Sequence, residues 1–191
     1  MQNNYLEFLK SKSKKFAKQH ELMDIILFGS SVRGKIEPKD IDIILISHEK
    51  NIKKNLEVLQ EFRNILKNKI SKEDTKIINI EELFESNLLA RQGILIEGIS
   101  LVYDRPLSNI MGFAGYSLFS YKLKNLNNTE KTKFIYSLIG RNKKGIIKKL
   151  KGVQIGKGAV MIPIENSEVF KEFLEKWEIK YNMRKILVSE F

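Results

Sequence analysis

The sequence has no cysteine, only two histidines and no apolar run of transmembrane length. Without cysteine, the chain can form neither a disulfide framework nor a zinc site with thiolate ligands. His20 and His48 are its only imidazoles, and each is expected to be an isolated surface side chain. Because the sequence shows no signal peptide and no membrane span, it predicts a cytoplasmic protein that does not enter a membrane.

The composition favours a folded, basic protein. The 191 residues are 42% hydrophobic, which is enough for a core in one domain or in two small ones. The formal charge is +11, and such an excess favours polyanionic partners. The chain is also rich in Lys, Ile and Asn, a bias that base composition alone can produce. Contact with nucleic acid and a merely solvated basic surface therefore both remain open.

Two short apolar runs enclose the most informative stretch of the sequence. The run from Ile25 to Phe28 stops at Gly29, and a second, β-branched run covers residues 41–46. Both are typical of buried strands. Asp40 and Asp42 stand at the start of the second strand, where alternation directs them to the same side. Two adjacent carboxylates repel each other, and a hard divalent cation such as Mg²⁺ relieves that repulsion.

The turn after the first strand has the features of a phosphate site. Gly29 permits a tight turn and a close approach of backbone to ligand. Successive N–H groups in such a turn bind anions, and the Ser30 hydroxyl adds a donor. Arg33 can form forked hydrogen bonds to phosphate oxygens. If a helix begins near residue 30, its N-terminus adds positive potential.

These residues together resemble the signature of the DNA polymerase β-type nucleotidyltransferase superfamily. The motif is Gly29-Ser30, a nine-residue spacer over 31–39, and then Asp40-Ile41-Asp42. Its Gly-Ser-Ser-Val-Arg-Gly form is most similar to the minimal nucleotidyltransferases of prokaryotes. The resemblance covers residues 20–48, with a looser likeness of layout to Asp104.

The resemblance implies a role for each matching residue. Gly29 and Ser30 would hold the nucleotide phosphates, and the catalytic residues Asp40 and Asp42 would bind two Mg²⁺ ions. Arg33 matches a position that is usually basic, and it is assigned to nucleotide binding. The spacing of the signature carries more weight than either half alone, because isolated Gly-Ser turns and Asp-x-Asp strand ends are common.

The superfamily usually has a third metal-binding carboxylate on a later strand, here expected at residues 75–80. Spacing to the next acidic residues puts Lys76 at that position, and a shifted register puts Asn79 there. Neither is acidic. Asp74 precedes the expected strand and could substitute if the strand begins early. The third carboxylate is the one placed to activate the attacking hydroxyl. Binding of nucleotide is therefore better supported than turnover.

Periodicity predicts an α+β fold in two parts. A nucleotidyltransferase domain over 1–104 would have a mixed sheet with helices on one side, and a second small α+β domain of unknown role would cover 105–191. The expected helices span 3–20, 49–69, 81–97, 129–139 (with Thr129 as N-cap) and 165–177. The expected strands span 25–28, 41–46, 75–80, 99–103, 116–123, 159–164 and 179–188, and a linker is expected at 106–115.

The second part contains the densest basic segment of the chain, residues 141–152. With the nearby rings of Tyr116, Phe119 and Tyr121, it is a candidate site for RNA or another polyanion. Strand alternation leaves at most half of those rings outside, so a core role for the aromatics is the stronger interpretation.

Three functions follow from the sequence. The first is transfer of a nucleoside monophosphate from a Mg²⁺-bound nucleoside triphosphate to a hydroxyl acceptor. The second is a nucleotide- or nucleic-acid-binding protein with impaired catalysis, as the uncertain third carboxylate suggests. The third is an antitoxin-like protein partner of a HEPN-type toxin, which the resemblance to minimal nucleotidyltransferases implies. The extra domain counts against the third.

Overall fold

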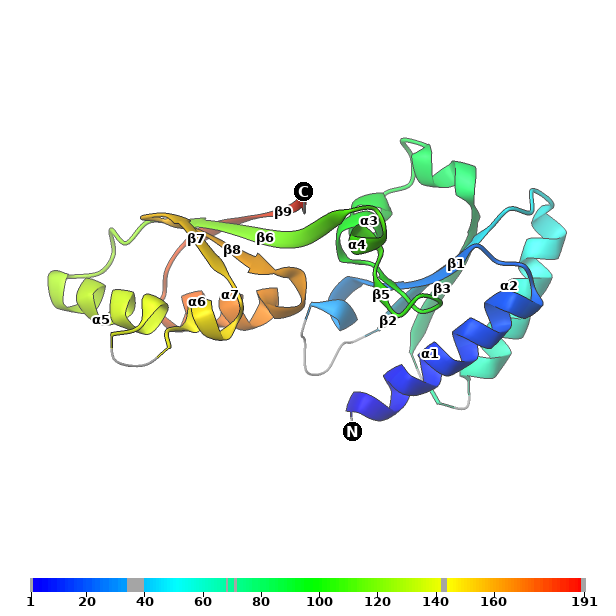
Figure 1. Cartoon of the computed structure of the whole chain (residues 1–191), viewed down its shortest axis with the longest axis horizontal. Helices are drawn as coiled ribbons and strands as arrows, with labels where there is room; N and C mark the ends of the chain where they lie inside the picture. Colours follow the sequence, from blue (N-terminus) through cyan, green and yellow to red (C-terminus); the bar gives the residue numbers. More distant parts are fainter. Residues whose placement is uncertain (1, 34–39, 68, 71, 142–143, 190–191) are drawn as a thin grey trace. The chain divides into compact units, whose positions relative to one another are not determined.

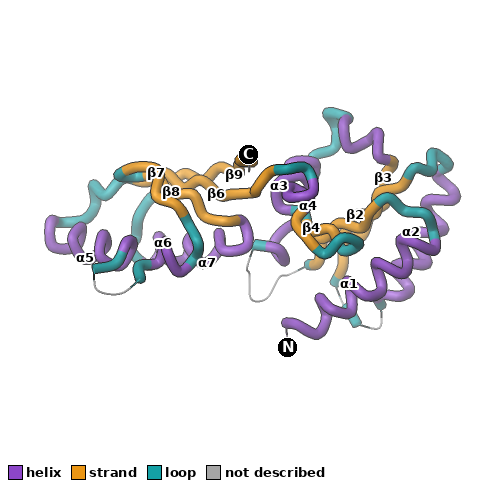
Figure 2. The backbone as a smooth tube through the Cα atoms, in the orientation of Figure 1, coloured by secondary structure: helices purple, strands orange, loops and turns teal. Residues whose placement is uncertain are grey.

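The computed structural model describes residues 2–33, 40–67, 69–70, 72–141 and 144–189. The chain divides into two compact units, Met1–Met111 and Gly112–Phe191, each built on its own sheet (Figures 1 and 2). The sequence-based fold class, α+β with a mixed first sheet and a second small α+β unit, is confirmed. The division falls later than residue 104 because Arg105 and Pro106 pair with the first sheet.

The first unit has a mixed five-stranded sheet in the order β3-β2-β1-β4-β5. β1 pairs antiparallel with both β2 and β4, whereas β2 and β3 run parallel. The strands are β1 (Asp24–Phe28), β2 (Ile41–Ser47), β3 (Glu73–Asn79), β4 (Ile99–Ser100) and β5 (Arg105–Pro106). The expected strand 99–103 is thus only two residues long, because the chain turns through positive φ at Asp104 and returns as β5.

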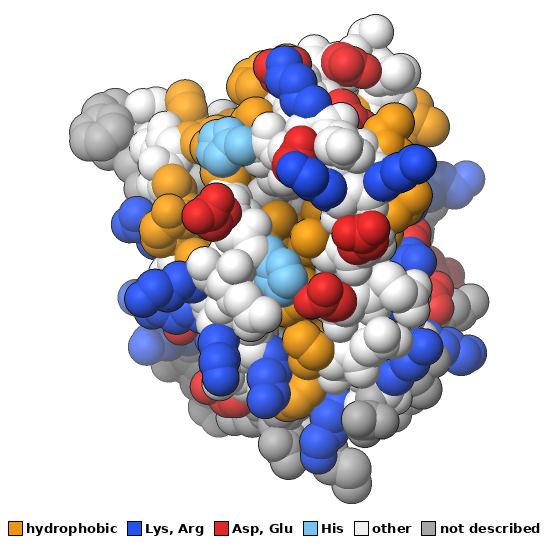
Figure 3. Space-filling model, turned by 90° about the vertical axis from the view of Figure 1, so that its right-hand side faces the viewer, with side chains coloured by type: hydrophobic (Ala, Val, Ile, Leu, Met, Phe, Trp, Pro, Cys, Tyr) orange, Lys and Arg blue, Asp and Glu red, His pale blue; other side chains and the backbone are white. Residues whose placement is uncertain are grey.

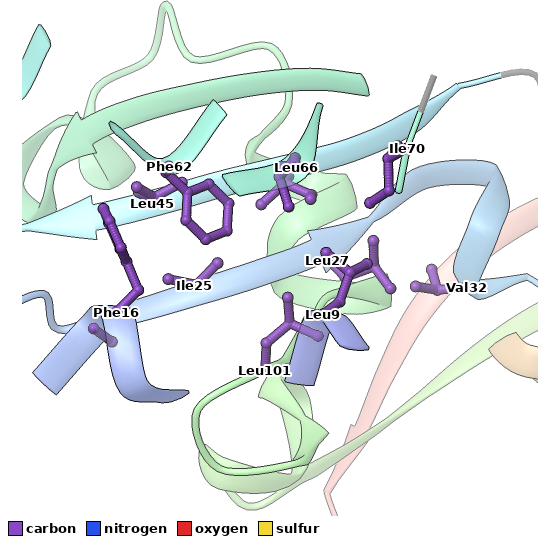
Figure 4. Packing of buried hydrophobic residues seen from close by; sticks show 12 residues of the cluster. Leu9, Phe16, Ile25, Leu27, Val32, Leu45, Phe62, Leu66, Ile70 and Leu101 are labelled. Atoms are coloured by element: carbon purple, nitrogen blue, oxygen red, sulfur yellow. The ribbon is translucent and has the colours of Figure 1, made fainter. Parts of the chain in front are cut away.

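One face of this sheet is covered by α1 (Gln2–Gln19) and α2 (Ile52–Leu66), as their apolar periodicity predicts. Leu9 and Phe16 of α1 and Phe62 and Leu66 of α2 pack on Ile25 and its neighbours in the strands (Figure 4). All five side chains are buried. α2 begins at its N-cap Asn51 and is shorter than the expected 49–69.

The opposite face carries the 3-10 turn η2 (Ile80–Phe84) and the helix α3 (Arg91–Glu97). They pack on alternate strand residues, so the expectation of helices on one side only is wrong. That second cluster comprises Ile26, Ile44, Ile46, Ile78, Leu83 and Ile94. Both faces of the sheet are therefore covered near its centre.

The expected continuous helix over 81–97 is also wrong. The chain leaves the helical conformation at Glu85, which is extended, and Arg91 donates hydrogen bonds to the carbonyls of Phe84 and Glu85 at 3.2 and 3.1 Å. Phe84 and Leu89, which lie within the expected helix, are both exposed.

The second unit is an antiparallel sheet in the order β7-β8-β6-β9. Its strands are β6 (Phe113–Tyr121), β7 (Val153–Gly156), β8 (Ala159–Pro163) and β9 (Tyr181–Ser189). The helices α5 (Asn128–Ile139), α6 (Ile146–Lys149) and α7 (Ser167–Lys176), with η3 (Ile164–Asn166) before α7, lie on the same side of the strands (Figure 1). Phe134, Ile147 and Phe170 join them to Phe119 of β6 in one core.

Two local expectations in this region differ from the structure. The expected linker 106–115 contains α4 (Leu107–Ile110) and the start of β6. Asn127, rather than Thr129, caps α5, because its side chain accepts from the Glu130 N–H in a reciprocal capping box. His48 is exposed, as expected, and both histidine rings are visible at the surface in Figure 3. The expectation of an isolated surface side chain is wrong for His20, which is partly buried, packs on the Phe16 ring and pairs with Glu61 at 3.2 Å. None of the described helices is both long and apolar enough for a membrane span.

Candidate functional site

The candidate phosphate turn touches the second predicted aspartate. β1 ends at Phe28, whose register partner across the sheet is Asp42, and the single 3-10 turn η1 (Gly29–Val32) follows. Gly29 has φ +79°, and a Cβ there would lie 2.0 Å from Asp42 Oδ2. Only glycine therefore lets the turn and this carboxylate approach so closely.

The parallel pairing of β2 and β3 decides among the three candidates for a third carboxylate position. β3 begins at Glu73, before the expected start, and Asp74 is the register partner of Asp42. Neighbours in register project to the same face, so these two carboxylates lie side by side. Lys76 is instead opposite Ile44. Asn79 is buried and caps η2.

The environment of Asp42 disfavours its ionised form. The pKa of Asp42 is raised, first by its burial and then by the neighbouring charges of Asp74 and Asp40. The positive charges of Arg33 and Lys76 lower it but do not cancel the rise. Repulsion between these carboxylates is the condition that a divalent cation would relieve.

An open hollow of about 440 Å³ adjoins this carboxylate group. Asp40 and Asp74 line it, with Lys67 and Lys72 among the surrounding side chains. Glu73 and Ile70 complete the lining. The hollow thus combines carboxylates, which can bind Mg²⁺, with lysines, which can bind phosphate.

No group of three or more His, Cys, Asp or Glu residues in the described part of the chain could hold a metal ion by itself. Mg²⁺ commonly binds through one or two carboxylates, water and substrate phosphates rather than in a protein cage. Asp40 and Asp42 fit that mode, because their charges repel and a glycine turn lies beside them.

Arg33 has a partner that the sequence analysis missed. Its Nη1 donates to Glu97 Oε2 at 3.0 Å, from the end of η1 to the end of α3. Glu97 is only 3% exposed. The sequence did contain a signal for this ion pair, because Glu97 lies between the apolar segments 94–96 and 99–101. A carboxylate buried among apolar residues requires a partner. The guanidinium is therefore fixed near Asp42, whose pKa it lowers.

The two serines of the turn differ. Ser31 Oγ donates to the Phe28 carbonyl at 3.1 Å and so closes the turn. The Ser30 hydroxyl, partly buried, makes no hydrogen bond to another described residue, so it remains a candidate donor to a ligand. Because η1 has only one turn, the expected helix-dipole contribution is small. The rest of the spacer, 34–39, lies outside the described residues.

The structure separates the residues of the candidate polyanion site. Phe119 and Tyr121 are buried on the helix-covered side of their sheet, and Tyr116 lies on the other side, partly buried. α6, within the basic segment 141–152, packs into the same core through Ile147. Its Lys148 and Lys149 are exposed, whereas Lys143 lies outside the described residues. The three rings and these lysines therefore do not form one surface.

Comparison with known proteins agrees with the geometry of the first unit. Residues 11–104 match the model of the family described as "Polymerase beta, Nucleotidyltransferase". No similar curated protein and no similar solved structure was found. The match includes the glycine turn, the paired aspartates and Asp74, and it ends before the second unit begins.

Proposed function

Residues 11–104 are a polymerase beta-type nucleotidyltransferase domain, and from this premise we propose that the protein transfers a nucleoside monophosphate from a Mg²⁺-bound nucleoside triphosphate to a hydroxyl acceptor. Asp40 and Asp42 would hold two Mg²⁺ ions, which would neutralise the developing charge on the transferred phosphoryl group. Gly29 and Ser30 would bind the β- and γ-phosphates, and Arg33 would add positive charge beside them.

The observation that carries this proposal is the register of Asp74 with Asp42 beside the Gly29 turn. The proposal needs a third carboxylate that can accept a proton from the acceptor hydroxyl, and Asp74 supplies one on the correct face. Lys76 Nζ lies 3.5 Å from Asp74 Oδ2, and both side chains are more than half exposed. Such a surface pair is weak and leaves Asp74 accessible.

Thermal unfolding tests the nucleotide site. The wild-type chain and Asp40→Asn/Asp42→Asn would be heated with each nucleoside triphosphate, with and without Mg²⁺. A ligand at a hundred times its dissociation constant adds about 2.7 kcal/mol to the free energy of unfolding. We expect a Mg²⁺-dependent shift with at least one nucleotide that the double variant loses. If no nucleotide raises the melting temperature, the proposed site is wrong.

Asp74→Asn separates turnover from binding. We expect this variant to keep the Mg²⁺-nucleotide shift but to release pyrophosphate much more slowly with any hydroxyl acceptor that the wild type uses. Lys76→Gln, on the same face of β3, is the matched control and should retain activity. If the wild type shows the shift and no pyrophosphate release with any acceptor, the binding-only alternative replaces transfer.

A further inference from the structure

The excess positive charge of the chain belongs almost entirely to the second unit. Residues 112–191 contain 16 Lys and Arg against 7 Asp and Glu, a formal charge of +9. Residues 1–111 contain 18 against 16, a formal charge of only +2. Consistently, acidic and basic side chains are interspersed on the face drawn in Figure 3, where α2 lies. A polyanionic partner would therefore be attracted to the second unit.

The sheet of this unit has one face that the helices do not cover. Residues that alternate with the core positions of β6 project to it, namely Tyr116, Leu118 and Ser120. Their register partners extend the same face across β8 and β9. These partners are Ala159, Met161, Pro163, Asn182, Arg184 and Ile186. The face thus has an aromatic ring, apolar groups, one arginine and no carboxylate at these positions.

A hollow of about 550 Å³ continues this face at the end where β6 stops and β9 begins. Ser120 and Asn182, paired across the two strands, belong to both the face and the hollow. Lys122, Lys124 and Lys180 line it, all exposed and none in an ion pair with another described residue. Its remaining lining is Tyr121, Asn125, Gly158 and Tyr181, so no carboxylate faces the lysines from the lining.

The hollow is built by close backbone packing. The Tyr121 N–H donates to the Gly158 carbonyl at 2.8 Å, and a Cβ on Gly158 would lie 2.5 Å from the Tyr121 carbonyl oxygen. The Tyr181 hydroxyl donates to Glu175 of α7 at 3.2 Å, so this ring is held in place from the helix side. The lysines therefore surround backbone that is held by close packing.

We propose that the open sheet face and the adjoining lysine hollow of the second unit bind single-stranded RNA. The lysines would contact phosphates, Tyr116 would stack on a base, and Ser120 and Asn182 could bond ribose 2′-hydroxyls. The βαββαβ order with two central and two edge strands also occurs in RNA-recognition modules, which use the uncovered face of such a sheet. Shared topology alone assigns no function, so the proposal rests on the charge and lining described above.

This surface differs from the basic segment 141–152. The hollow follows β6 and precedes β9, whereas 141–152 precedes β7 and joins the helix-side core through Ile147. The difference supplies a matched control, because three exposed lysines can be replaced at each place.

The test is fluorescence anisotropy of a short labelled oligouridylate with the full chain at two or more salt concentrations. We expect Lys122→Gln/Lys124→Gln/Lys180→Gln to weaken binding by roughly tenfold or more and to reduce the salt slope by about 2, as the loss of three phosphate contacts to a single strand requires. The control Lys144→Gln/Lys148→Gln/Lys149→Gln removes the same charge and should change affinity much less. Asp40→Asn/Asp42→Asn should bind RNA as the wild type does, whatever its fate as an enzyme.

A Tyr116 variant and two other nucleic acids test base stacking and the preference for single-stranded RNA. Tyr116→Leu should weaken binding without changing the salt slope, since stacking releases no counterions. Oligothymidylate and an RNA duplex should bind more weakly than the oligouridylate. Equal losses from the two lysine triples would overturn the proposal in favour of unspecific charge. Equal affinity for DNA or for the duplex, or absence of binding, would also overturn it.

Discussion

At the scale of single residues, the fold disfavours the ionised form of Asp42. Burial and the charges of Asp74 and Asp40 raise the pKa of Asp42 above its ordinary value of 3.8, so the folded chain binds a proton there more readily than the unfolded chain. Between 3.8 and that raised pKa, stability falls as the pH rises. Above this window the full cost is present. The ionised Asp42 therefore lowers the stability of the fold at neutral pH when no cation is bound.

Asp42→Asn should relieve this cost. At neutral pH and without Mg²⁺, we expect the variant to have a higher melting temperature than the wild type. As the pH falls, the stability of the variant should rise less than that of the wild type, because asparagine has no carboxylate to protonate. Glu85→Gln, which neutralises an exposed carboxylate, should show neither effect. Melting curves across the acid range measure both. A lower melting temperature for Asp42→Asn at neutral pH would mean that this carboxylate stabilises the fold.

Gly29 is the second residue whose replacement has a defined cost. Alanine there would need positive φ and would place its Cβ 2.0 Å from Asp42 Oδ2. The backbone term alone is roughly 1–2 kcal/mol. Urea denaturation of Gly29→Ala should show at least that loss, together with loss of the nucleotide shift. The control is Gly156→Ala, whose Cβ would meet nothing within 4 Å. Equal costs at the two glycines would contradict the close approach described here.

At the scale of elements, Asn79 joins η2 to the loop after β2. Its side chain accepts from the Glu81 N–H at 2.9 Å and donates to the carbonyls of His48 and Glu49 at 3.2 Å. Asn79→Ala should cost more than Asn127→Ala, although both asparagines begin a capping box. Asn127 is exposed and should lose about 1 kcal/mol. Replacing the buried Asn79 also leaves the backbone carbonyls of His48 and Glu49 without this donor, which adds roughly 1–3 kcal/mol to the loss of stability. Equilibrium unfolding in urea ranks the two variants, and equal losses would contradict this role.

The same elements explain what the sequence could reveal. The strand–turn–strand around Gly29 and Asp42 was predictable, because short apolar runs, a glycine and alternation are local signals. The register of Asp74 was not, because it depends on where β3 begins, and Asp74-Thr75-Lys76 has no apolar residue to mark a strand. The helix expected at 81–97 was wrong because its leucine spacing does not distinguish a continuous helix from a turn and a loop that pack leucines on the sheet. Glu97 was missed because its partner, Arg33, lies 64 residues away.

At the scale of the whole molecule, each unit has a core made only from its own residues. The clusters on both faces of the first sheet come from residues before 112, and the cluster under the second sheet comes from residues after it. A unit with its own core can unfold on its own. The residues of the proposed nucleotide site all lie in the first unit, and those of the proposed RNA surface all lie in the second. The two binding activities should therefore be separable by core substitutions.

Phe62→Ala and Phe170→Ala test this separation, because the two rings are fully buried in different units. Each truncation should cost about 3–5 kcal/mol in its own unit. We expect calorimetry of Phe170→Ala to show an early transition of the second unit and a later one that Mg²⁺-nucleotide still raises. Phe62→Ala should instead lower the temperature of the nucleotide-dependent transition. Below that temperature, this variant should keep the wild-type affinity for oligouridylate. If both variants shift one shared transition equally, the units fold as a single cooperative body, and the separation of their binding sites does not extend to their stability.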